Sequence, residues 1–126
     1  MDKLVGQKWL KRAKDDLNWT EANIRESVWY GACFTAQQAS EKALKAYLIS
    51  KGKKAAKLHD LGVLLELCKE TDQAFDGLKD ACATLTDYYA PTRYPDIGEF
   101  MSFSRPAAVE AQKFAEKIIT FVEERI

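Results

Sequence analysis

Apolar side chains recur at intervals of three and four residues along most of the chain, and this spacing restricts the fold more than any other feature. Within residues 5–25 the recurring positions are Trp9, Ala13, Leu17, Thr20 and Ile24. Such a stripe is typical of the buried face of an amphipathic helix, whereas a half-buried strand would alternate apolar and polar residues. The chain shows no such alternation. The spacing therefore predicts an all-α fold.

Signals for helix ends divide the chain into a bundle of about five helices. The second helix is expected over residues 30–50, where many alanines favour the helical state and let a neighbouring helix approach closely. Gly52 follows it, in the position where helices commonly end. We expect the two long helices to form an antiparallel hairpin that shorter helices close. The expected N-caps of those helices are Asp60 for residues 60–70, Thr71 or Asp72 for a helix reaching Tyr88, and Ser104 for a last helix to the C terminus.

Size and charge limit the classes of protein to which the chain can belong. Its 126 residues fit a single domain over residues 1–126. The formal net charge is zero, so no global field attracts it to nucleic acid or to a membrane surface. The charges are unevenly placed, because residues 42–57 hold six lysines and no acid while residues 60–99 hold nine acids and three bases. This asymmetry fits either a solvated surface or pairing with a complementary partner.

The cysteines indicate a reducing compartment. There are three of them, Cys33, Cys68 and Cys82, an odd number at wide spacing and without a C-x-x-C motif. This pattern predicts buried thiols and neither disulfides nor metal ligands. The chain also has no apolar run of membrane-spanning length and no leader pattern. We therefore expect a soluble, cytoplasmic protein with no membrane contact, no metal and no cofactor.

A proline-containing segment over residues 89–96 holds the polar residues that are most informative about function. Pro91 and Pro95 predict an irregular loop, and they stiffen the backbone that bears Arg93, Tyr94 and Asp96. An arginine in a fixed position can bind phosphate or carboxylate through its planar fork. Tyrosines beside it could stack on a base. The sequence leaves open whether Arg93 binds an anionic ligand or only locks the loop by bonding helix carbonyls or Asp96.

Two other polar features are candidates for a ligand site. His59 is the only histidine and precedes the expected helix cap, so it is either structural or a general acid–base group or nucleotide ligand. Gln37, Glu41 and Lys45 are spaced by four and share one face of the second helix. That face could line a cleft, form a dimer seam, or lie in solvent with Glu41 paired to Lys45. No recognised catalytic or phosphate-loop motif accompanies these residues, so no catalytic residue is assigned.

Three segments together resemble the HEPN domain family: ACFTAQQASEKALKA at residues 32–46, LHDL at 58–61 and YAPTRYPD at 89–96. Their order and spacing also fit, and the resemblance covers nearly the whole chain. It implies an up-and-down helical bundle, commonly a homodimer, that often acts beside a separate minimal nucleotidyltransferase. It also implies that His59, Arg93 and Asp96 are the positions where function is to be sought.

One departure from the family pattern bears on enzyme activity. RNase members of the wider superfamily carry an arginine shortly before a histidine, but residues 53–55, upstream of His59, are Lys, Lys and Ala. The usual RNase motif is therefore absent. The resemblance thus implies first a non-catalytic domain that binds a nucleotide or similar anion at His59 and Arg93 and partners a nucleotidyltransferase. The alternatives are an RNase toxin of a toxin–antitoxin pair with a departing active site, and a dimeric scaffold without ligand.

Overall fold

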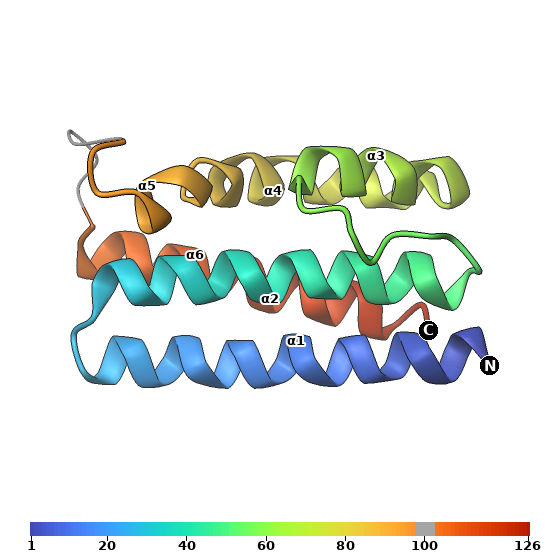
Figure 1. The fold of residues 1–126 in the computed structure, drawn as a ribbon, viewed down its shortest axis with the longest axis horizontal. Helices are drawn as coiled ribbons and strands as arrows, with labels where there is room; N and C mark the ends of the chain where they lie inside the picture. Colours follow the sequence, from blue (N-terminus) through green and yellow to red (C-terminus); the bar gives the residue numbers. More distant parts are fainter. Residues whose placement is uncertain (98–102) are drawn as a thin grey trace.

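The structure, a computed structural model, describes residues 1–97 and 103–126, and in this part of the chain all regular secondary structure is helical (Figure 1). It confirms the all-α prediction and contains all five expected helices together with one short additional helix. The elements in chain order are α1 (Asp2–Arg25), α2 (Trp29–Ser50), α3 (Leu61–Thr71), the 3-10 helix η1 (Gln73–Leu78), α4 (Lys79–Thr86), α5 (Tyr89–Arg93) and α6 (Arg105–Glu123).

The long helices α1 and α2 form the expected antiparallel hairpin, with α2 in the middle of the bundle (Figure 1). Helix α2 packs against α1, α6, α3, α4 and α5, so neighbours surround it. Gly6 permits the close approach of α1, because a Cβ at that position would lie 2.8 Å from the Ala46 carbonyl oxygen of α2. The abundant alanines of α2 serve the same purpose on its other faces.

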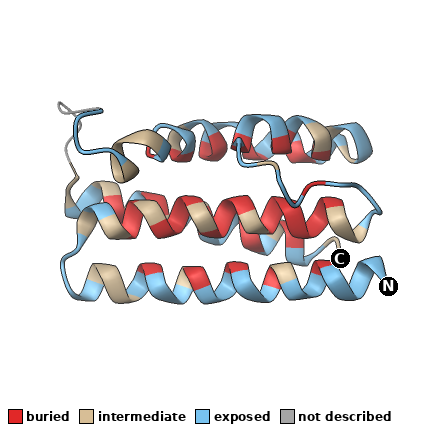
Figure 2. Cartoon of the chain, in the orientation of Figure 1, coloured by how far each residue is buried: buried red, intermediate tan, exposed pale blue. Residues whose placement is uncertain are grey.

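The central position of α2 makes it the core of the molecule (Figure 2). Most of its residues are buried, whereas α1 is buried along one stripe only. An aromatic cluster joins the surrounding elements, with Phe75 centred 4.5 Å from the Tyr47 ring and 4.8 Å from the Phe121 ring. No helix in the described part of the chain is both long and apolar enough to cross a membrane.

Most of the predicted helix ends are confirmed by hydrogen bonds. The Asp60 carboxylate accepts from the backbone N–H groups of Gly62 and Val63 at 2.8 and 3.2 Å, and Ser104 caps α6 in the same way. Gly52 has a φ of 78°, the left-handed conformation expected just past a helix end. Asp72 is also a cap, but the element that it begins starts as the 3-10 helix η1 before α4 continues it.

The prediction of an irregular loop after Tyr88 is wrong for its first residues, which form the short helix α5. Pro91 is compatible with this helix because it is the third residue, and backbone N–H groups of a first turn have no partner inside the helix. The second proline, Pro95, lies beyond the helix end. The later part of the predicted loop, residues 98–102, lies outside the described residues.

Candidate functional site

The polar face of α2 is buried, not exposed. Gln37, Glu41 and Lys45 are 1%, 4% and 2% exposed. The alternative that this face lies in solvent is therefore wrong, although the pairing of Glu41 with Lys45 that it assumed is present. The reason is that α5 and the segment before α3 cover this side of α2, bringing Arg93 onto Gln37 and His59 onto Glu41. Burial of polar groups this complete requires partners within the protein.

Lys45 is the centre of a buried polar cluster. Its ammonium group donates to Glu41 Oε2 at 2.9 Å and to the Ala56 carbonyl oxygen at 3.0 Å. It also lies 5.3 Å from the centre of the Trp9 ring, whose face attracts a cation. These contacts tie α1, α2 and the segment before α3 together at one point.

His59 lies at the edge of this cluster. Its Nδ1 is 3.2 Å from Glu41 Oε2 and 3.4 Å from Lys45 Nζ. Nδ1 cannot donate to Glu41 Oε2 and accept from Lys45 Nζ at once, because it either carries a proton or does not. We assign it as a donor to Glu41, because the contact is shorter, the acceptor is charged, and Lys45 already has two other acceptors. The ring is otherwise largely exposed, and Nε2 is then the nitrogen available to a ligand.

Arg93 is fixed from several sides. One terminal nitrogen donates to the Tyr89 carbonyl oxygen at 2.7 Å and the other to Gln37 Oε1 at 3.3 Å. The guanidinium carbon lies 3.8 Å from the centre of the Tyr89 ring and 4.8 Å from that of Phe34. Arg93 therefore bonds a helix carbonyl, which is one of the alternatives that the sequence leaves open, and its role in binding an anion stays a prediction. A guanidinium has five N–H donors, so these two bonds leave it further donors for a ligand.

These residues line one hollow of about 400 Å³, which we call the basic cleft. Its cationic side chains are those of Lys42, Lys45 and Arg93, and its carboxylate is that of Glu41. Lys42 also pairs with the buried Asp16 at 2.6 Å. Three cations against the two carboxylates of Glu41 and Asp16 leave the basic cleft with an excess of positive charge. Its full lining is Trp9, Gln38, Glu41, Lys42, Lys45, Ala56, His59, Tyr89 and Arg93.

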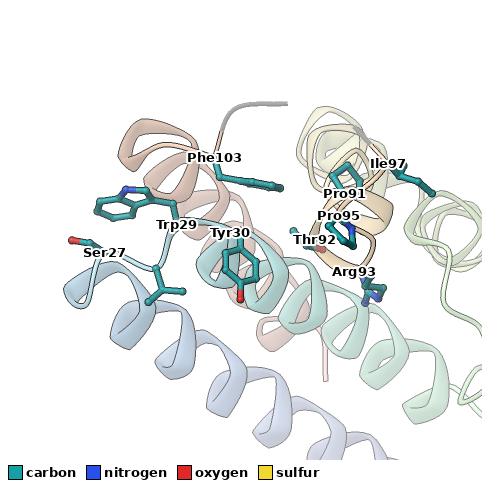
Figure 3. Close-up of a pocket in the computed structure, with 10 residues that line it drawn as sticks. Ser27, Trp29, Tyr30, Pro91, Thr92, Arg93, Pro95, Ile97 and Phe103 are labelled. Atoms are coloured by element: carbon teal, nitrogen blue, oxygen red, sulfur yellow. The ribbon is translucent and has the colours of Figure 1, made fainter. Parts of the chain in front are cut away.

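Two further hollows adjoin the basic cleft. One of about 430 Å³ lies between α2, α3 and α5, shares His59 and Tyr89 with it, and is also lined by Gln37. The other, of about 800 Å³, lies where α2 begins, and half of the residues in its wall are aromatic or proline (Figure 3). We call this one the end cleft. Arg93 lines both the basic cleft and the end cleft, so it stands between them.

The structure brings most of the predicted site residues together. His59, Arg93 and Glu41 line the basic cleft, and Gln37 holds Arg93 in place. Tyr94 and Asp96 are exposed and line none of the three hollows. For all six predicted residues, the role of binding a ligand stays a prediction.

Sequence reasoning missed two of the charged and aromatic members of the basic cleft, Trp9 and Lys42. The apolar spacing of residues 5–25 assigns Trp9 only to a core stripe, and the charge pattern assigns Lys42 only to a run of basic residues. The signal for Lys42 is its spacing, four residues after Gln38 and three before Lys45, which places it on the face of α2 that lines the cleft. For Trp9 no sequence signal exists, because its membership depends on how α1 packs against α2.

Nucleophilic and metal chemistry find little support among the described residues. No group of three or more His, Cys, Asp or Glu side chains is placed there to hold a metal ion. The three cysteines are buried, as predicted. Burial raises the pKa of Cys33 to about 11 and that of Cys82 to about 12, so both thiols stay protonated at neutral pH.

Comparison with known proteins assigns the family. The HEPN domain model matches residues 7–125. The crystal structure of TT1696 from Thermus thermophilus is 33% identical in sequence, covers 100% of both chains and superposes with a TM-score of 0.88. ST0689, an archaeal HEPN homologue, is 24% identical over 95% of this chain and 96% of its own, with a TM-score of 0.76. No curated protein matches the chain. The match over nearly its whole length shows that this chain belongs to the HEPN domain family.

Proposed function

We propose that the protein binds a nucleotide or a similar anionic ligand in the basic cleft and acts with a separately encoded minimal nucleotidyltransferase. The observation that carries the first half is the convergence of Lys42, Lys45 and Arg93 on one hollow that also contains His59. Three cations against two carboxylates, Glu41 and the Asp16 that pairs with Lys42, leave one net positive charge that attracts an anion, and the arginine fork suits a phosphate or carboxylate group.

Arg93 is well prepared for this role. Its two hydrogen bonds and its stacking on Tyr89 hold the guanidinium before any ligand arrives. Binding therefore requires little loss of side-chain freedom at this residue, which favours affinity. The Tyr89 and Trp9 rings in the same wall offer apolar surface to a base or sugar.

Thermal unfolding with a panel of nucleotides tests the proposal. A ligand that binds only the folded state raises stability by RT ln(1 + [L]/Kd), about 2.7 kcal/mol at one hundred times Kd. We expect the rise for wild type and its loss in Arg93→Ala. Arg12→Ala is the matched control, because Arg12 is an exposed arginine outside the cleft. If no nucleotide shifts the midpoint and Arg93→Ala only lowers it, the protein is a scaffold that Arg93 holds together.

The partner half of the proposal rests on family membership and on the uneven charge of the chain. We expect a minimal nucleotidyltransferase encoded beside this gene to copurify with the protein and to be released by salt. We also expect a homodimer, as is common for the family. Light scattering of the purified protein, alone and with that partner, measures the mass of the homodimer and of the complex. A protein that stays monomeric and does not bind the partner contradicts this part of the proposal.

A second candidate is RNA cleavage, which the bond between Glu41 and His59 favours. Donation from Nδ1 to a buried carboxylate leaves Nε2 free to act as a general base, while Arg93 in the same cleft supplies a cation to stabilise developing charge. We expect such cleavage to persist in a metal chelator and to be lost in both His59→Ala and Arg93→Ala with the helical content unchanged. Cleavage that survives in His59→Ala would come from a contaminant or another site.

A further inference from the structure

Within the described part of the chain, one buried side-chain polar atom has no hydrogen-bond partner, and that atom is Glu41 Oε1, which belongs to a residue of the basic cleft. The other carboxylate oxygen, Oε2, lies within hydrogen-bonding distance of both Lys45 and His59. The two oxygens of one carboxylate are therefore in very different situations. A buried charged acceptor without a donor is unfavourable, so such atoms are rare unless something absent from the protein itself satisfies them.

No donor of the described residues forms a hydrogen bond with Glu41 Oε1, and the cations of the cleft are engaged elsewhere. Lys45 Nζ already contacts Glu41 Oε2 and the Ala56 carbonyl oxygen. Arg93 is directed to Gln37 and to the Tyr89 carbonyl oxygen, and Lys42 pairs with Asp16. Each cation lining the cleft thus has acceptors of its own.

We propose that the basic cleft selects anionic ligands that also carry an N–H donor, and that Glu41 Oε1 accepts from that donor. This inference rests on the proposed anion site and adds a specificity to it. Since only one oxygen is available, it matches a single amino group, such as the exocyclic amine of adenine or cytosine. The anionic group of the same ligand would lie toward Arg93 and Lys42, which line the same hollow.

Access to Glu41 Oε1 requires a small rearrangement, because the atom is buried. His59 is the wall residue best placed to provide it. It lies in the segment between α2 and α3, its side chain is 61% exposed, and it lines both the basic cleft and the hollow next to it. Rotation of the imidazole into the neighbouring hollow would open the path without moving a helix.

The test compares three probes by calorimetry on the intact protein. AMP carries phosphate and the amine, purine riboside 5′-monophosphate lacks only the amine, and ribose 5-phosphate lacks the base. We expect AMP to bind roughly tenfold to a hundredfold more tightly than purine riboside 5′-monophosphate, the range for one hydrogen bond to a charged group. In Glu41→Gln, a neutral acceptor of nearly the same shape, this ratio should fall toward one.

The outcomes separate this inference from the proposed function. Equal binding of AMP and purine riboside 5′-monophosphate to the wild type overturns the inference, because water then satisfies the carboxylate, but leaves the anion site standing. Binding of none of the three probes overturns both. If Glu41→Gln does not fold, the wild-type ratio still decides. A preference for AMP that persists unchanged in a folded Glu41→Gln protein would assign the selectivity to a residue other than Glu41.

Discussion

Replacing Lys45 with methionine removes one charge of the buried pair while keeping an unbranched side chain in the core. The Lys45 side chain is 2% exposed and that of Glu41 is 6%, so the remaining carboxylate cannot regain its hydration. Breaking a buried ion pair from one side costs about 3–5 kcal/mol. Domains typically have a free energy of unfolding of about 5–15 kcal/mol. Lys45→Met should therefore remove a large fraction of the total stability.

Urea unfolding followed by circular dichroism measures this loss, and the chain offers a matched control. Lys11 and Asp15 form an ion pair with the same spacing on α1, but their side chains are 77% and 47% exposed. Lys11→Met should cost less than about 0.5 kcal/mol. The double variant Glu41→Met/Lys45→Met should recover most of the stability lost in Lys45→Met, since it leaves no unpaired charge. A loss in Lys45→Met as small as in the control would refute the reasoning.

Three further predictions concern stability. The free energy of unfolding should fall as pH rises above 9.0, by about 1.4 kcal/mol per pH unit for each buried thiol. The cause is that thiols in the unfolded state ionise near pH 9.0, whereas Cys33 and Cys82 in the folded state have pKa values of about 11 and 12. Their contribution to the free energy of unfolding is therefore complete below pH 9.0 and is lost as the pH rises above it. A flat profile in urea titrations at increasing pH would contradict this. Asp60→Ala should lower the stability measured by thermal unfolding by about 1 kcal/mol, because the cap of α3 is lost, and Asp60→Asn should lower it much less. Equal losses in the two variants would exclude capping as the cause. Gly6→Ala should cost roughly 1–3 kcal/mol because its Cβ would collide with α2, whereas Gly77→Ala, with open space around it, should be neutral or mildly stabilising; equal melting points of the two variants would argue against close helix approach.

The fold was predictable because its local signals agree with one another. The stripes of apolar residues indicate where the helices run. The caps at Asp60 and Ser104 and the glycine at position 52 mark helix ends that the structure confirms. The short helix α5 was not predictable from proline content alone. Whether Pro91 breaks a helix depends on its distance from the first residue, and that residue is fixed by where α4 ends.

The candidate site was predictable in its residues but not in its geometry. The spacing of Gln37, Glu41 and Lys45 showed that they share a face, yet spacing cannot tell whether a face meets solvent or another segment. That depends on α5 and the segment before α3 folding over α2, which are contacts between residues distant in the chain. The meeting of His59 with Glu41, and its sharing of one cleft with Arg93, is a consequence of that packing.

Arg93 has a further consequence for the molecule, because one side chain forms part of the wall of two neighbouring hollows. The same guanidinium fastens α5 to α2 through Gln37 and Phe34. A ligand in the basic cleft and a ligand in the end cleft would therefore compete for the remaining N–H donors of one fixed guanidinium. Binding on one side of Arg93 would thus weaken binding on the other, without any change in the helices of the bundle.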